Sequence, residues 1–193
     1  MNYVFEMIRK SAGASLLISL GSYVLLKVGN PFGPILFALG LLSVCYMGQN
    51  LFTGKCGFIF KDKIKLWEIL LILGVNLIVG YILGFIYSYA DSDVFNNAAA
   101  KVLTWEVSTA FFIKSILCGI VMYIAVYIYK KGSNLGILLG VPLFIFAGFQ
   151  HSIANAITLG ASRMWHWSII ICVLGNFIGS LFIYYLSKEN KND

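Results

Sequence analysis

Long apolar stretches separated by short basic segments are the feature that most restricts how this chain can fold. Six of them approach or exceed the ~20 residues that a helix needs to cross a bilayer. They cover residues 12–28, 34–53, 66–90, 107–129, 135–159 and 167–187. Only 11% of the residues are charged, whereas soluble domains carry about 25%. The sequence therefore predicts an all-α membrane protein with a single transmembrane domain over residues 1–193.

The positions of the basic residues predict how these helices are oriented. Lysine and arginine collect in the cytoplasmic loops of membrane proteins. On one side of the predicted spans lie Arg9, Lys10, Lys61, Lys63, Lys65, Lys130, Lys131, Lys188 and Lys191. On the other side lie only Lys27, Lys101 and Arg163. We therefore expect both termini in the cytoplasm and no cleaved leader. The net charge of +6 is spread over these loops, so we expect the lipid bilayer and no nucleic acid as a partner.

One histidine, His151, lies within the fifth apolar stretch, in the string Gly-Phe-Gln-His-Ser-Ile-Ala-Asn of residues 148–155. A titratable ring at membrane depth costs free energy unless it faces a cavity or a partner. Polar residues and glycines also interrupt the second stretch, at residues 48–55. Broken helices are tolerated at this depth where they line a cavity or are buried in protein. We therefore predict that helices two and five are broken. His151 then lines a pore or, alternatively, bonds backbone carbonyls between helices.

The two interruptions occupy equivalent places in the two halves of the chain. Asn50 and His151 lie 101 positions apart, and Asn76 and Asn176 lie 100 positions apart. Both members of the second pair precede an apolar, glycine-containing stretch. Residues 1–90 and 101–193, approximately, are thus predicted to be copies of three spans each, with the second copy inverted. Inverted repeats with paired broken helices are typical of transporters whose solute path lies at the repeat interface.

The other polar residues do not form a catalytic or metal-binding pattern. The sequence has no HExxH motif, no acidic pair at membrane depth, no serine–base arrangement and no cofactor motif. Its cysteines are widely spaced, without a CxxC motif, and we interpret them as small packing residues; they are Cys45, Cys56, Cys118 and Cys172. We therefore expect no enzyme activity, no metal and no cofactor.

Five short strings carry a resemblance to a known family. They are Phe-Ala-Leu-Gly-Leu at residues 37–41, Leu-Phe-Thr-Gly at 51–54, Pro-Leu-Phe at 142–144, the histidine string at 148–155, and Gly-Asn-Phe-Ile-Gly at 175–179. With these strings the chain resembles the formate/nitrite transporter family over nearly all its length, as a short member. The resemblance implies an aquaporin-like protomer of six helices, with helices two and five broken. It also implies a homopentamer with one pore in each protomer, and small monovalent weak-acid anions such as formate, nitrite, hydrosulfide and lactate as solutes.

The resemblance also implies which residues form the centre of the pore. By motif position, His151 is similar to the central pore histidine, and Thr53 to the hydroxyl group opposite it. Asn176 is similar to the asparagine that supports the histidine region. From the residues alone, the alternative role of Thr53 is to cap the segment that follows it.

Four apolar residues and one lysine complete the implied pathway. Phe37 and Leu41 with Phe144 and Leu51 resemble the two hydrophobic constrictions, although residues of this kind at helical spacing are normally packing residues. Lys101 resembles a vestibule lysine that attracts anions. The alternative is a solvated lysine in a short extracellular loop, beside Asp91 and Asp93.

Two positions depart from the family pattern. Gln150 replaces a glutamate that, if it lies close enough, favours protonation of the neighbouring histidine. Gly119 replaces an asparagine and so removes a side-chain amide. Asn155, like Asn50, is expected to satisfy backbone groups that the breaks leave free. Lys114, inside the fourth apolar stretch, is compatible either with snorkelling or with a position facing the protomer interior.

These observations predict a channel or facilitator for small monovalent weak-acid anions. A bare anion in a dry constriction faces a solvation cost of tens of kcal/mol in the ideal limit. Transient protonation or hydrogen bonding at His151 reduces that cost, because imidazole donates protons and hydrogen bonds near physiological pH. Because Gln150 and Gly119 lack the expected groups, a neutral small-solute channel is the alternative. A non-transporting membrane protein or a membrane enzyme is less expected. The many Ile, Lys and Asn residues suggest a bacterial cytoplasmic membrane.

Overall fold

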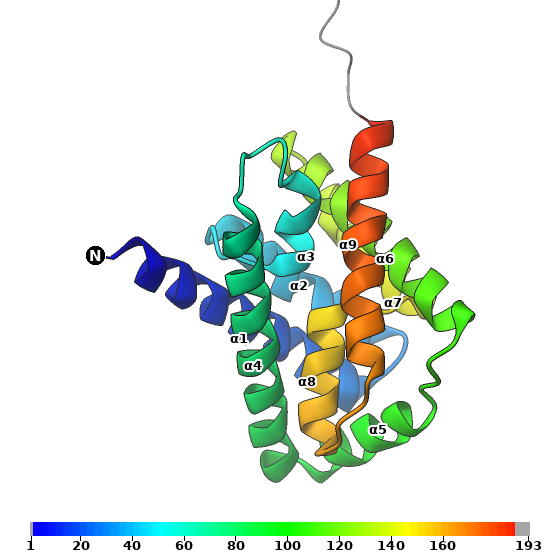
Figure 1. Cartoon of the computed structure of the whole chain (residues 1–193). Helices are drawn as coiled ribbons and strands as arrows, with labels where there is room; N and C mark the ends of the chain where they lie inside the picture. Colours follow the sequence, from blue (N-terminus) through cyan, green and yellow to red (C-terminus); the bar gives the residue numbers. More distant parts are fainter. Residues whose placement is uncertain (1, 188–193) are drawn as a thin grey trace, which may run out of the picture.

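The computed structural model describes residues 2–187, and all regular elements in this range are helical (Figure 1). They are α1 (Tyr3–Val28), α2 (Phe32–Tyr46), α3 (Phe52–Lys55), the 3-10 helix η1 (Cys56–Phe58), α4 (Leu66–Ala90), α5 (Ser92–Leu103), α6 (Thr109–Lys130), α7 (Leu135–Phe146), α8 (Ser152–Ser162) and α9 (Ser168–Leu186). Lys188 and Lys191, which contribute to the predicted orientation, lie outside the described residues.

Four helices in this part of the chain, α1, α4, α6 and α9, are long and apolar enough to cross a membrane. Their bounds follow the predicted spans, except that α1 begins at Tyr3 and not near residue 12. The polar start stays helical because the Asn2 side chain accepts a hydrogen bond from the Val4 N–H and caps the helix. Glu6 and Lys10, one turn apart, add an ion pair of 2.8 Å.

The two predicted interruptions are present. The backbone leaves the helix between α2 and α3, and again between α7 and α8. Shortly after the first helix of each pair, Gly48 has a φ of 61° and Gly148 a φ of 68°. This left-handed conformation ends a helix, and glycine adopts it without a steric penalty. The glycines therefore set the place where each helix breaks.

A short helix, α5, occupies the segment that was predicted to be a loop. Its start is capped by Asp91, whose carboxylate accepts hydrogen bonds from the next backbone N–H groups. Val94, Ala98 and Val102 recur every four residues and are buried, which places one apolar stripe against the bundle. In Figure 1, α5 lies at the lower end of the molecule and α3 lies toward the upper end.

The two acidic residues at the start of α5, Asp91 and Asp93, pair with Lys27 near the end of α1. Lys27 Nζ lies 3.0 Å from Asp91 Oδ2 and 2.6 Å from Asp93 Oδ2. The hydrogen bond from the Lys27 ammonium holds the pKa of Asp91 below its usual value, so the carboxylate is charged at neutral pH. Lys101, expected in a loop, lies in the last turn of α5. The residue as a whole is exposed, while burial of its ammonium lowers the pKa of Lys101.

Candidate functional site

A buried histidine and a buried threonine meet where the two broken helices resume. Thr53 lies on α3 and His151 immediately precedes α8. Thr53 Oγ1 and His151 Nε2 are 2.8 Å apart, and the two residues are 1% and 2% exposed. The structure thus brings together the two residues that the resemblance placed opposite each other, although they are 98 positions apart in the chain.

The hydrogen bond at the other ring nitrogen indicates the tautomer of the neutral His151 ring. His151 is the N-cap of α8, and its Nδ1 accepts a hydrogen bond from the Ala154 N–H at 3.1 Å. A nitrogen that accepts a hydrogen bond carries no proton, so the neutral ring holds its proton on Nε2 and donates it to Thr53 Oγ1. A second proton on Nδ1 would break the cap and add positive charge at the positive end of α8. The geometry therefore presents His151 as a neutral Nε2–H donor.

Apolar side chains enclose this polar pair. The Phe144 ring stacks on the His151 ring, with centroids 5.5 Å apart and an interplanar angle of 24°. Phe37 meets Phe144 edge to face at 6.1 Å. Phe37, Leu41 and Leu51 are each 1% exposed. All four residues that the resemblance assigned to constrictions are therefore buried. The two leucines also line a cavity whose wall includes residues of α6.

Asn176 holds the backbone on both sides of His151. Its Oδ1 accepts a hydrogen bond from the Ser152 N–H at 2.8 Å. Its Nδ2 donates to Gln150 O at 2.8 Å and to Ser115 O at 2.8 Å. Helix breaks leave backbone N–H and C=O groups without intrahelical partners. The Asn176 side chain on α9 bonds backbone groups on three segments and so fixes the position of His151.

Asn76, on α4, makes the matching contacts at the first break. Its Oδ1 accepts from the Phe52 N–H at 2.8 Å, and its Nδ2 donates to Ser11 O at 2.8 Å and to Asn50 O at 3.1 Å. Asn76 lies 24 residues from Phe52 and 26 residues from Asn50. Asn176 lies at the same two separations from Ser152 and Gln150. Sequence reasoning used Asn76 only as a mark of the repeat and missed this role.

Gln150 points to partners other than the histidine. Its Oε1 accepts from Asn155 Nδ2 at 2.9 Å, and its Nε2 donates to Gly148 O at 3.1 Å. Asn155 therefore bonds a side chain, where the sequence led us to expect backbone partners. The Cys172 thiol, interpreted as a packing group, also donates to Gln150 O at 3.1 Å. Gln150 and Asn155 thus brace the second break together.

Within residues 2–187, no hydrogen bond or ion pair joins the side chains of the two lysines considered from the sequence to His151 or Thr53. Lys101 lies in the last turn of α5. Lys114 is exposed on α6, and its carbonyl oxygen accepts a hydrogen bond from the Gln150 N–H at 3.3 Å.

Gly119 lies where α6 packs closely on α9. A Cβ atom added at this position would overlap the carbonyl group of Asn176. The glycine therefore allows the helix that carries Asn176 to approach α6, and a larger residue requires the two helices to separate. Gly119 stands where the resemblance led us to expect an asparagine. Its small size allows the close packing that positions Asn176.

We expect the substitution Gly119→Ala to lower the melting temperature of the detergent-solubilised protein by several degrees, because overpacking of close helices costs about 1–3 kcal/mol. Gly74→Ala is the matched control, since Gly74 lies within α4 with open space around it. Alanine is favoured over glycine within helices, so the control should retain or gain stability. Equal melting temperatures for the two variants would contradict the close packing of Gly119.

The fold and the site define an integral membrane protein in which two interrupted helices meet at a buried histidine–threonine pair. The sequence model of the formate/nitrite transporter family matches residues 3–188. The chain belongs to this family, whose members are channels and transporters and not enzymes.

Relatives of known sequence or structure are similar to at least three quarters of the chain. The uncharacterized transporter YrhG of Bacillus subtilis is 26% identical, over 83% of this chain and 72% of its own length. The uncharacterized transporter YHL008C of Saccharomyces cerevisiae is 24% identical over 76% of this chain, which spans only 28% of the yeast protein. Two solved structures have a TM-score of 0.78: an FNT family ion channel, 22% identical over 97% of this chain and 92% of its own, and a pentameric formate channel with formate bound, 20% identical over 95% and 96%. At these identities the two structures establish the fold.

Proposed function

We propose that this protein is a channel or facilitator for small monovalent weak-acid anions such as formate, nitrite and hydrosulfide. The observation that carries the proposal is the hydrogen bond between His151 Nε2 and Thr53 Oγ1 inside an apolar enclosure. A lone anion is strongly destabilised in such an enclosure. Two adjacent hydrogen-bond donors of fixed position offset part of that cost for a solute with one or two acceptor atoms.

Of the two routes expected at the histidine, hydrogen bonding is favoured over proton donation. Neutral imidazole is too weak an acid to give its Nε2 proton to a carboxylate. Donation requires a second proton at Nδ1, which already accepts the Ala154 N–H. We therefore propose that the solute oxygen or sulfur displaces Thr53 as the acceptor of the Nε2–H. Any proton that accompanies the solute then enters with it from bulk water.

The proposed architecture is a six-span inverted repeat of the aquaporin-like type. The equivalent hydrogen bonds of Asn76 and Asn176 at the two breaks support it. A homopentamer with one pore in each protomer is supported by the likeness to a pentameric formate channel. The basic residues between η1 and α4 support an orientation with this loop and both termini in the cytoplasm, in a bacterial cytoplasmic membrane.

The runner-up is a channel for neutral small solutes. The absence of a charged partner for His151 among residues 2–187 is the observation in its favour. In that case the Nε2–H and the Thr53 hydroxyl bind an uncharged solute, and membrane potential has no effect on its flux.

A solute panel in proteoliposomes of the wild-type protein separates these functions. We expect formate, nitrite and hydrosulfide to enter well above the rate of empty liposomes, and faster at mildly acidic than at mildly basic pH. Glycerol and urea should not cause swelling beyond that of the control. Swelling with the uncharged solutes, at a rate independent of membrane potential, would instead establish the neutral-solute channel.

A further inference from the structure

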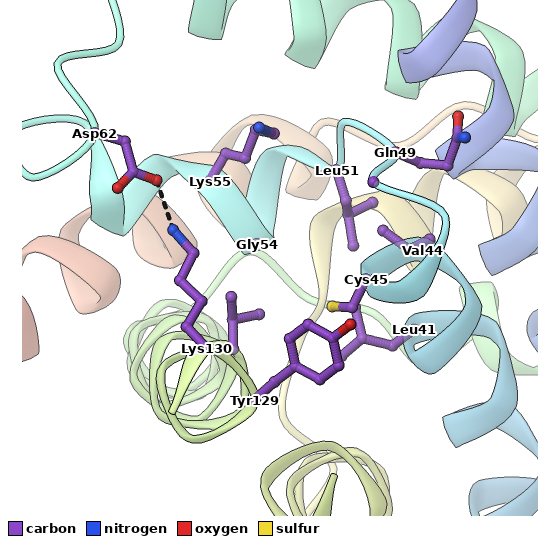
Figure 2. A pocket seen from close by; sticks show the side chains of 12 residues that line it. Leu41, Val44, Cys45, Gln49, Leu51, Gly54, Lys55, Asp62, Tyr129 and Lys130 are labelled. Carbon is purple, nitrogen blue, oxygen red and sulfur yellow. Dashed lines mark hydrogen bonds and ion pairs between the residues drawn. The ribbon is translucent and has the colours of Figure 1, made fainter. Parts of the chain in front are cut away.

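An ion pair fastens the loop after η1 to the end of α6. Lys130, the last residue of α6, has its Nζ 2.6 Å from Asp62 Oδ2 in this loop, as the dashed line in Figure 2 shows. The same ammonium lies 4.0 Å from the centroid of the Phe58 ring in η1, within cation–π distance. These contacts hold the two segments side by side, so their next residues in the chain, Lys61 and Lys131, also come together.

Lys61 and Lys131 meet at a single aromatic ring. Their Nζ atoms lie 5.3 Å and 5.6 Å, respectively, from the centroid of the Tyr127 ring. The two ammonium groups are therefore no farther apart than the sum of these distances, and each is carried on a flexible four-carbon stem. Both residues are exposed, and among the described residues neither side chain has an ion pair or a hydrogen bond. The surface around this ring thus carries two positive charges without a counter-ion.

These charges lie at the depth expected for lipid headgroups. The helix α6 is one of those long and apolar enough to cross a membrane, and its 22 residues have about the length of the hydrocarbon core. Tyr127 lies in its last turn, and Lys131 directly follows its end. In the proposed orientation this end faces the cytoplasm, where the anionic lipids of the leaflet attract basic residues next to a spanning helix.

A continuous group of aromatic rings borders the two lysines. Tyr127 stacks on Tyr123, with centroids 5.9 Å apart and an interplanar angle of 21°, and Tyr123 meets Tyr184 of α9 edge to face at 6.4 Å. Phe60, in the loop after η1, stacks on Tyr184 at 6.0 Å and packs on Tyr185 at 5.8 Å. Phe60 and Tyr185 are exposed. The surface is therefore cationic at one place and apolar beside it, which matches a phospholipid better than a small soluble anion.

We propose that Lys61 and Lys131 bind the phosphate group of one anionic phospholipid, whose acyl chains lie against Phe60 and Tyr185. Both ammonium groups donate charge-assisted hydrogen bonds to the phosphate oxygens. A zwitterionic lipid binds more weakly, because its own headgroup cation is repelled by the two lysines. Since one lysine comes from the loop after η1 and the other directly follows α6, the lipid joins the same two segments as the ion pair. The site is independent of the solute that the protein conducts.

Native mass spectrometry of the solubilised full chain, titrated with lipid, tests the site. We expect phosphatidylglycerol to bind the wild-type protein more tightly than phosphatidylcholine with the same acyl chains. Lys61→Gln and Lys131→Gln together should weaken phosphatidylglycerol binding about twentyfold, from about fivefold for each lysine, and leave phosphatidylcholine binding unchanged. Arginine at both positions keeps the charge and should retain tight binding. The matched control is Lys63→Gln with Lys65→Gln, which removes the same charge from the same loop but no ammonium at the Tyr127 ring.

Thermal unfolding gives a second readout, because a ligand that binds only the folded protein raises its melting temperature. Phosphatidylglycerol should raise it for the wild type and the control, and not for the Lys61→Gln, Lys131→Gln variant. Inorganic phosphate should not reproduce the effect.

Three results would overturn the site. Equal losses of phosphatidylglycerol binding in the two double variants would show attraction to any basic surface. Equal binding of the two lipids to the wild type, or an equal effect of inorganic phosphate, would exclude an anionic phospholipid as the ligand. A change in the size of the lipid-free oligomer on substitution of Lys61 and Lys131 would show that this surface is a contact between copies of the chain. None of these measurements involves transport, so their failure leaves the proposed function unaffected.

Discussion

Substitution of His151 by phenylalanine is expected to reduce formate uptake into proteoliposomes more than about a hundredfold, the size of effect seen when a hydrogen-bond donor is removed from a dry reaction site. Phenylalanine preserves the flat ring that stacks on Phe144. It removes the Nε2–H that faces Thr53. The solute then meets an apolar enclosure with one hydroxyl donor, and its desolvation is no longer offset. Initial rates at several pH values measure the loss.

The same substitution also removes the N-cap of α8, so its effect on folding must be separated from its effect on transport. His166→Phe is a matched control, because His166 Nδ1 accepts a hydrogen bond from the Ser168 N–H at 3.2 Å just before α9. The His166→Phe variant loses a comparable backbone hydrogen bond, but at a place away from Thr53 and His151. It should therefore transport formate normally. His151→Asn keeps a good capping residue and an amide donor, and should retain more activity than His151→Phe. Normal formate and hydrosulfide uptake by His151→Phe at every pH would refute the proposed role.

Substitution of Asn176 by alanine is expected to produce the largest loss of stability. It removes three hydrogen bonds in a buried position, those to the Ser152 N–H, Ser115 O and Gln150 O, although Gln150 O keeps the Cys172 thiol as a donor. A buried group left without a partner, such as the Ser152 N–H, costs about 1–3 kcal/mol, and each lost bond adds to this, so the sum is a large fraction of the stability of many proteins. We expect a large fall in melting temperature and a loss of transport, because the backbone around His151 is no longer fixed.

Two further variants are compared with Asn176→Ala to test whether its effect comes from the hydrogen bonds at the break. Asn134→Ala removes a half-buried asparagine whose exposed hydrogen bond joins the Tyr46 hydroxyl, and it should change the melting temperature little. Asn76→Ala should cause a loss similar to that of Asn176→Ala, because Asn76 makes the equivalent contacts at the first break. A stable, active Asn176→Ala protein would show that water or relaxation of the chain replaces the amide.

The sequence was sufficient to predict the breaks, but not the directions of the side chains around them. Gly48 and Gly148 stand out against apolar surroundings, and their positive φ values follow from a local signal. The contact between Thr53 and His151 joins residues 98 positions apart, and only the resemblance to a family indicated it. No local pattern indicates that Gln150 turns toward Asn155, because the backbone at a break follows no periodic rule.

The misplaced features lie at the ends of the helices, where sequence signals are weak. The stripe of Val94, Ala98 and Val102 that forms α5 is short, and alanine contributes little hydrophobic contrast. Lys27 pairs with Asp91 across a separation of 64 residues, and no local pattern indicated this partner. Ion pairs between loops depend on how the helices pack, which periodicity alone does not determine.

The asparagine contacts at the two breaks have a consequence for how such a protein diversifies. Asn76 bonds only groups from the first half of the chain, and Asn176 bonds only groups from the second. Each half therefore satisfies the backbone at its own break with its own asparagine. Under the proposed function, substitutions at positions such as Phe37 and Thr53 change the solute path, while the hydrogen bonds that hold the two breaks stay in place.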